Sequence, residues 1–139
     1  MNNKIQIING PNLNLLGKRE TSIYGNQTFE NYFEELQIRF PQLELYYFQS
    51  NHEGDLIDKI HDTGFRFKGI VLNAGALTHY SYALADAVRA IETPVVEVHI
   101  SDIFQREDFR KVSLTAAHCV KMISGKGLEG YAEAIQIFL

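Results

Sequence analysis

The chain has no tryptophan, only three prolines and a single cysteine, Cys119. One cysteine excludes an internal disulfide, which fits a reducing compartment. No apolar run approaches the roughly 18 residues that a transmembrane helix needs. The apolar N-terminal run is short and is broken by residues 9–12, Asn-Gly-Pro-Asn, so it does not resemble a signal peptide. We therefore expect a cytoplasmic protein.

The sequence also has fewer basic than acidic residues. Thirteen Lys and Arg face 17 Asp and Glu, which gives a net charge of -4. Nucleic acids and anionic membranes both require a basic face, so neither is an expected partner. The 139 residues are 45% hydrophobic and 22% charged, which is typical of a globular protein. This length predicts a single domain over residues 1–139.

Several familiar site motifs are absent. The sequence contains no GxxxxGK[ST] and no GxGxxG, which argues against the common nucleotide-phosphate cradles. It has no GxSxG nucleophile motif and no group of His, Cys, Asp and Glu with zinc-binding spacing. Cys119 begins a predicted buried strand and is interpreted as a structural thiol. These absences argue against the common nucleotide sites, a zinc site and a serine nucleophile.

The sequence does contain short apolar runs that alternate with segments of helical periodicity. The runs predict strands at residues 4–8, 43–48, 69–72, 94–98 and 120–123. The periodic segments predict helices at residues 28–40, 53–63, 81–91 and 128–138. We interpret this order as strand–helix units repeated five times. It predicts a flavodoxin-like α/β fold, with a five-stranded parallel sheet, helices on both faces and right-handed crossovers.

Polar residues gather after the predicted strands, where ligands bind in such sheets. They fall at residues 9–12, 50–53, 73–79, 99–102 and 125–127. Asn, Ser, Thr and Gly are common turn and cap residues, but this does not explain His79 and His99. About 18 residues separate the first strand from the next helix, where two to six are typical. That loop is either a lid over a substrate or a surface excursion.

Four of these residues suit proton transfer. His99 can act as a general acid or base, although a lone histidine at a strand end is often structural. Tyr24 would serve as a base only if a neighbour such as Arg19 stabilised its ionised form. Asn12 offers a neutral donor to a developing enolate. A substrate carboxylate could be held by the backbone around Ile100 and Ser101 and by Arg106 and Arg110.

Longer blocks of this sequence resemble one family. They are NGPNLNLLGKRE at 9–20, YG at 24–25, QSNHEG at 49–54, NAGALTH at 73–79, Ser81, Asp86-Ala87, EVHIS at 97–101, REDFR at 106–110 and ISGKGLEGY at 123–131. These blocks resemble type II 3-dehydroquinate dehydratase (type II dehydroquinase). The resemblance extends in order over nearly the whole chain.

The resemblance implies a hydro-lyase of the shikimate pathway, which leads to chorismate and the aromatic amino acids. Such an enzyme converts 3-dehydroquinate to 3-dehydroshikimate by anti elimination through an enolate, with no cofactor. By the same resemblance, Tyr24 is the base and Arg19 keeps it ionised. Asn12 stabilises the enolate through a water, and His99 is the acid, oriented by Glu97. The implied substrate-binding residues are Asn73, His79, Ile100, Ser101 and Arg110, with Asp86 reaching a neighbouring subunit's site in a dodecamer built as a tetramer of trimers.

Two positions depart from the family pattern. Thr21 replaces a common proline in the loop, which would loosen a lid. Asp102 replaces a common asparagine beside Ser101, and its carboxylate would repel an anionic substrate unless it points away or pairs with an arginine.

Two other classes of function share the predicted fold. One is a flavodoxin-like module that binds a nucleotide or flavin, and the other is a structural or signalling domain without catalysis. The first would require a phosphate loop, which the sequence lacks. The second would not require Tyr, Arg, Asn and His at one edge of the sheet. The site residues rather than the fold favour the enzyme.

Overall fold

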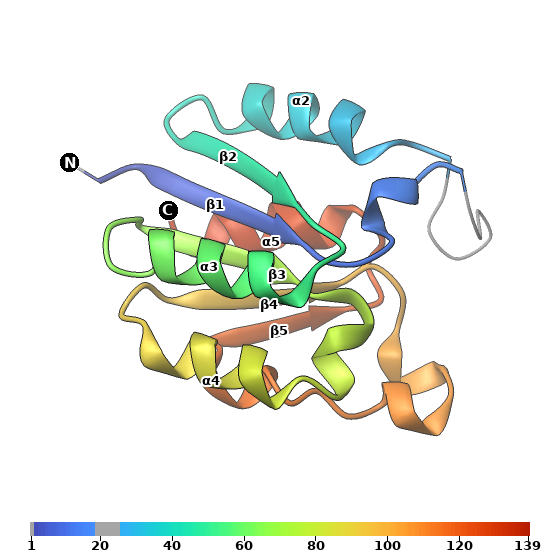
Figure 1. Cartoon of the computed structure of the whole chain (residues 1–139). Coiled ribbons are helices and arrows are strands. Elements are labelled where there is room, and N and C mark those ends of the chain that lie inside the picture. The colour runs from blue at the N-terminus through green and yellow to red at the C-terminus, as the bar shows by residue number, and fades with distance from the viewer. Residues whose placement is uncertain (1, 19–25) are drawn as a thin grey trace.

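A computed structural model describes residues 2–18 and 26–139. Five parallel strands form one sheet in the order β2-β1-β3-β4-β5 (Figure 1). This is the flavodoxin-like order that the sequence predicted. The strands are β1 Lys4–Asn9, β2 Glu44–Gln49, β3 Gly69–Asn73, β4 Val95–His99 and β5 Lys121–Ser124.

The four predicted helices are present with small changes at their ends. They are α2 Phe29–Arg39, α3 Glu53–Thr63, α4 Tyr82–Ala90 and α5 Glu129–Ile137. The Thr28 side chain accepts a hydrogen bond from the Asn31 backbone N–H and thereby caps α2. Ser81 caps α4 in the same way through the Leu84 N–H.

The expectation of five strand–helix units is wrong for the connection between β4 and β5. That connection contains three single-turn 3-10 helices, η3 Ile103–Gln105, η4 Asp108–Arg110 and η5 Ala116–His118, and no α-helix. Its apolar side chains include exposed Phe104 and Phe109, so it lacks a continuous apolar stripe to pack on the sheet. Cys119 and the exposed Val120 precede β5 rather than beginning it.

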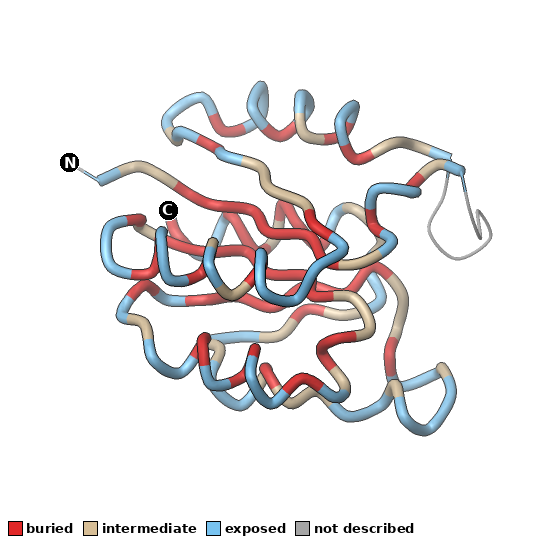
Figure 2. Tube along the Cα trace, viewed as in Figure 1, coloured by how far each residue is buried: buried red, intermediate tan, exposed pale blue. Residues whose placement is uncertain are grey.

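The sheet separates two apolar cores. One lies between the sheet and the pair α2 and α5, and it holds an aromatic cluster that includes Phe29, Tyr32 and Tyr131. The other lies under α3 and α4. Figure 2 shows buried segments along the central strands and on the inner side of these helices. The strands β3 and β4 are buried along their whole length, which explains why most of their residues are apolar.

The strand register brings the polar strand ends together. Asn9 at the end of β1 is paired with Gln49 of β2 on one side and with Asn73 of β3 on the other. His99 at the end of β4 is paired with Ser124 of β5. Within the described ranges, none of the helices combines the length and apolar character needed to span a bilayer.

Candidate functional site

A cleft lies at the carboxyl ends of β1, β3 and β4. Its void space, including the open mouth, is about 620 Å³. The lining residues are Pro11, Asn12, Leu13, Asn73, Gly75, Ala76, His79, His99, Ile100, Ser101, Ile103, Arg106 and Arg110. The cleft thus brings together seven of the residues expected at the site, namely Asn12, Asn73, His79, His99, Ile100, Ser101 and Arg110.

Three expected residues are not placed in this cleft. Asp86 lies on α4 and does not line the cleft. Its side chain is largely exposed, and its Oδ1 atom is 3.4 Å from Arg89 Nη2. Arg19 and Tyr24 lie outside the described residues, as does Thr21, so the predicted lid is not described either.

The loop after β1 is held against the ends of its neighbouring strands. The Gly10 N–H donates to the Asn73 carbonyl at 2.7 Å. The Asn12 N–H donates to Asn51 Oδ1 at 3.0 Å, and Gln49 Nε2 donates to the Gly10 carbonyl at 3.2 Å. Asn12 has a φ of 70°, a left-handed conformation that asparagine tolerates better than most residues. These contacts present Asn12 at the cleft.

Asn73 is oriented from behind by a buried tyrosine. Asn73 Nδ2 donates to the Tyr131 hydroxyl at 2.9 Å, and that hydroxyl donates to Asn9 Oδ1 at 2.8 Å. The Gly75 N–H donates to Asn73 Oδ1 at 3.1 Å. Burial raises the pKa of Tyr131 well above its usual value, so the phenol keeps its proton. The Asn73 amide is therefore fixed with one Nδ2 hydrogen bonded and the second available to a ligand.

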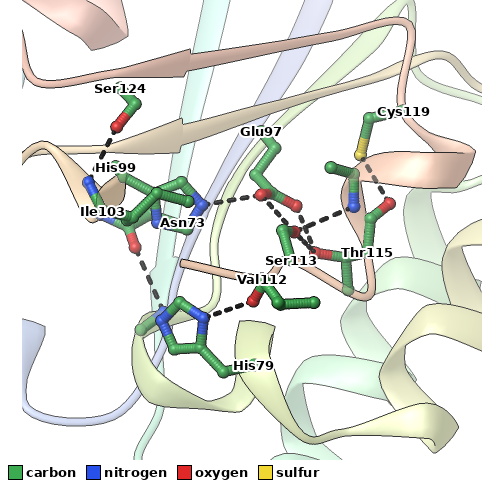
Figure 3. A network of polar contacts seen from close by, with 12 residues as sticks. Asn73, His79, Glu97, His99, Ile103, Val112, Ser113, Thr115, Cys119 and Ser124 are labelled. Carbon is green, nitrogen blue, oxygen red and sulfur yellow. Dashed lines mark hydrogen bonds and ion pairs between the residues drawn. The ribbon is translucent and has the colours of Figure 1, made fainter. Parts of the chain in front are cut away.

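His99 and Glu97 form a buried pair on β4. Two residues apart on a strand, they share one face of the sheet, and His99 Nε2 lies 2.7 Å from Glu97 Oε2 (Figure 3). Burial alone would raise the pKa of Glu97. The hydrogen bond and charge interaction with His99, together with hydrogen bonds from Ser113 and Thr115, outweigh burial, so the pKa lies below its usual value. Glu97 is therefore an anion that can orient His99 and stabilise its protonated form.

His79 faces His99 across the cleft. The two rings are stacked with centroids 6.3 Å apart. His79 Nδ1 lies 2.7 Å from the Val112 carbonyl, so Nδ1 carries a hydrogen and Nε2 is the other available nitrogen. Burial lowers the pKa of His79, and nearby His99 and Arg110 lower it further, against the opposing effect of the Val112 carbonyl. His79 is thus suited to hydrogen bonding as a neutral imidazole.

The β4–β5 connection supplies the remaining polar groups. Arg106 Nη1 donates to Ser101 Oγ at 3.3 Å, and Arg110 Nε donates to Glu107 Oε2 at 3.1 Å. Asp102 does not line the cleft, and its carboxylate accepts from the Phe104 N–H at 3.0 Å at the start of η3. The repulsion that Asp102 would exert on an anion is thereby reduced.

Sequence reasoning missed Ser113, Thr115 and Tyr131 as supports of the site. The Tyr131 position was part of a recognised block, but only the structure shows its hydroxyl between Asn9 and Asn73. Ser113 and Thr115 lie in an irregular segment with no periodic signal. Among the side chains of residues 2–18 and 26–139, no three His, Cys, Asp or Glu residues are grouped so that they could hold a metal ion.

The chain is similar to known proteins over nearly its whole length. The sequence model of the family described as "Dehydroquinase class II" matches residues 3–139. The 3-dehydroquinate dehydratase of Clostridium botulinum (strain Okra / Type B1) is 50% identical over 139 residues, which cover 99% of this chain and 95% of that protein. The 3-dehydroquinate dehydratase of Halothermothrix orenii is 52% identical over 136 residues, which cover 96% of this chain and 92% of that protein.

Two solved structures are also similar. The type II dehydroquinase from Butyrivibrio crossotus DSM 2876 has a TM-score of 0.93 at 45% identity, and the alignment covers 99% of this chain and 97% of that one. The type II dehydroquinase from Propionibacterium acnes has a TM-score of 0.91 at 36% identity, covering 99% and 96%. The similarity extends over nearly the full length of each of these proteins.

Proposed function

This chain belongs to the dehydroquinase class II family and is a 3-dehydroquinate dehydratase, and we propose that it eliminates water in the cleft at the carboxyl end of the sheet. The main support for this site is the buried His99–Glu97 pair, which lies beside the oriented amide of Asn73. The reaction is a step of the shikimate pathway. A flavodoxin-like nucleotide or flavin module is not favoured by the family and its named members.

The proposed elimination begins with Tyr24. As a tyrosinate kept ionised by Arg19, it removes the proton from the carbon next to the substrate ketone. The C–H electron pair moves into an enolate, which Asn12 stabilises through a water. The enolate then expels the hydroxyl group on the opposite face of the ring. His99 gives that hydroxyl its proton, so that water leaves and the conjugated enone forms.

The cleft supplies binding groups for a polyhydroxy keto acid. The second Nδ2 hydrogen of Asn73, together with Ile100 and Ser101, would hold the carboxylate and nearby hydroxyls. Neutral His79 and Arg110 would bind the remaining hydroxyls, and both line the same cleft as His99. Two basic side chains at the cleft, Arg106 and Arg110, favour an anionic substrate. No step of this scheme requires a metal or an organic cofactor.

Five further features belong to the proposal. The 139 residues act as one catalytic domain, and the protein functions in the cytoplasm, with neither nucleic acid nor membrane as a partner. Subunits assemble as a dodecamer, a tetramer of trimers. Asp86 completes the site of a neighbouring subunit, which is consistent with its exposed position outside its own cleft.

The direct test of this function follows the ultraviolet absorbance of the enone as 3-dehydroquinate is supplied. Tyr24→Phe removes only the hydroxyl, so turnover should fall by orders of magnitude while substrate binding stays nearly intact. Tyr46→Phe is the matched control, because the exposed Tyr46 hydroxyl contacts Glu44 far from the cleft, and its turnover should be unchanged. Near-normal turnover in Tyr24→Phe would rule out the tyrosinate base.

A further inference from the structure

The carboxylate of Glu97 is contacted by more than His99. Its side chain is fully buried, and both of its oxygens accept hydroxyl hydrogen bonds. The Thr115 hydroxyl donates to Oε1, and the Ser113 hydroxyl donates to Oε2 at 2.6 Å (Figure 3). Both hydroxyls come from the short segment before β5, which the Leu114 N–H anchors to the Thr78 carbonyl at 2.9 Å.

The number of available protons fixes the direction of these bonds. Each hydroxyl has a single proton, and Ser113 Oγ already accepts from the Ala116 N–H at 3.0 Å. The two hydroxyl oxygens lie 3.3 Å from each other, a longer contact than either makes with Glu97, so both hydroxyls donate to the carboxylate. An ionised carboxylate only accepts, so His99 Nε2 must carry a hydrogen. His99 Nδ1 is then the nitrogen that exchanges a proton with a bound molecule.

We propose that Thr115 and Ser113 are positioning residues of the dehydration reaction, which hold the Glu97 carboxylate and through it fix the orientation and proton position of His99. Neither residue lines the cleft, so neither is expected to touch the substrate. The inference rests on the proposed role of His99 as the acid that protonates the leaving hydroxyl.

This arrangement has a predictable effect on the strength of the acid. Two hydroxyl donors stabilise the His99–Glu97 pair more when it carries a net negative charge than when it has taken up a proton. They therefore lower the proton affinity of the pair. Removing one donor should raise the pKa at which the pair takes up its proton.

Other charged and titratable groups also lie around the pair. His79 from the turn η2 (Gly75–His79) stacks on His99, and Arg106 and Arg110 line the cleft beside it. Cys119 donates from Sγ to the Thr115 carbonyl at 3.3 Å. Burial, followed by the nearby Glu97 charge, raises the pKa of Cys119 to about 12, so this thiol stays neutral. A control variant that keeps the hydroxyl is therefore needed to isolate its effect.

The test is Thr115→Val, with Thr115→Ser as the control that keeps the hydroxyl. Imidazole signals of His99, assigned by their loss in His99→Gln, are followed by NMR as pH is varied in the protein without substrate. In Thr115→Val we expect the His99 titration to move up by roughly one pH unit, as the loss of one hydrogen bond to a charged group implies. Thr115→Ser should titrate like the wild type.

Kinetics provide the second readout. In Thr115→Val, kcat should fall about tenfold and its alkaline limb should move upward with the His99 titration, because a weaker acid transfers its proton more slowly. KM should stay within about twofold of the wild type, since the substrate contacts are unchanged. Ser113→Ala should show the same changes to a smaller degree, because the Ser113 site remains partly exposed to water.

An unchanged or lowered His99 titration in a folded Thr115→Val protein would overturn the proposal. If Thr115→Val does not fold, the same criterion applies to Ser113→Ala. The NMR titration requires no turnover, so it tests the positioning role even if the wild type proves inactive on 3-dehydroquinate. That inactivity would instead contradict the proposed function.

Discussion

At the scale of single residues, the cleft is organised by hydrogen bonds whose direction is fixed from behind. Asn73 cannot rotate its amide, because its oxygen accepts from Gly75 and its nitrogen donates to Tyr131. His99 is held in the same manner by Glu97. Polar groups that are oriented before the substrate arrives need little reorganisation during the reaction, which is how active sites stabilise charge that develops in the transition state.

Tyr131→Phe tests this orientation. The change leaves Asn73 Nδ2 without its acceptor and Asn9 Oδ1 without its donor, both in buried positions. We expect the free energy of unfolding to fall by about 1–3 kcal/mol, and KM to rise more than kcat falls. Urea unfolding and steady-state kinetics would measure both.

Tyr32→Phe is the matched control for that variant. Tyr32 lies in the same aromatic cluster, and its ring centroid is 6.4 Å from that of Tyr131. Its buried hydroxyl has no hydrogen-bond partner among the described residues. Removing this hydroxyl should leave stability equal or slightly higher, with unchanged kinetics. Equal effects of the two changes would show that the Tyr131 hydroxyl does not orient Asn73.

At the scale of elements, the site depends on the close approach of two loops, those after β1 and β3. Gly10 touches the backbone after β3, and a Cβ at this position would lie 2.5 Å from the Ala74 carbonyl oxygen. Backbone atoms cannot move aside as the end of a flexible side chain can. There is no room for a side chain at position 10, which explains the glycine in the polar segment at residues 9–12.

Gly10→Ala should destabilise the protein by about 1–3 kcal/mol and reduce turnover by displacing Asn12 and Asn73. Gly54→Ala is the control, because no atom lies within 4 Å of a Cβ at this exposed position of α3. It should stabilise the helix by about 0.5–1 kcal/mol. Thermal unfolding and the enone assay would compare the two, and a harmless Gly10→Ala would contradict the close approach.

Some of these elements could be predicted from the sequence and others could not. The helix at residues 53–63 was predicted with its observed bounds, because Leu56 and Ile60 repeat on one face and Gly64 follows. The polar ends of β1, β3 and β4 were predicted to meet because parallel strands end at one edge. The β4–β5 connection could not be predicted, because its 3-10 turns are held by side chains such as Asp102 that have no periodic pattern.

Within the site, the position of His99 at a strand end could be predicted from the sequence, and its part in proton transfer stays a prediction. Its supports could not be predicted, because Ser113 lies 16 positions and Thr115 lies 18 positions from Glu97 in the sequence. Contacts at that separation depend on how an irregular loop folds back on the sheet. The roles expected of all the site residues, including Asn12, Arg19, Tyr24, Asp86 and His99, stay predictions.

At the scale of the whole molecule, the buried carboxylate makes folding depend on pH. The pKa of Glu97 in the folded protein lies below its ordinary value of 4.5, so the unfolded chain binds a proton more readily. The stability that Glu97 contributes is complete above pH 4.5 and is lost as pH falls through the folded-state pKa. The pKa of His79 is also lowered from 6.5, so acidification below that value favours unfolding as well.

Urea unfolding between pH 3 and 7 should therefore show stability that decreases on acidification. Glu97→Gln should be less stable at neutral pH, and below about pH 4.5 it should lose stability less steeply than the wild type. Glu34→Gln, on an exposed position of α2, is the control and should keep the wild-type pH dependence. Parallel curves for Glu97→Gln and the wild type would contradict the lowered pKa of Glu97.

The central claim is that His99 protonates the leaving hydroxyl after a separate group has removed the substrate proton. The most direct test is His99→Ala with 3-dehydroquinate in deuterated water, followed by NMR. We expect deuterium to replace the proton at the carbon next to the ketone while little enone forms, because the enolate can form but cannot expel the hydroxyl. Loss of both exchange and dehydration, or dehydration at the wild-type rate, would contradict the account.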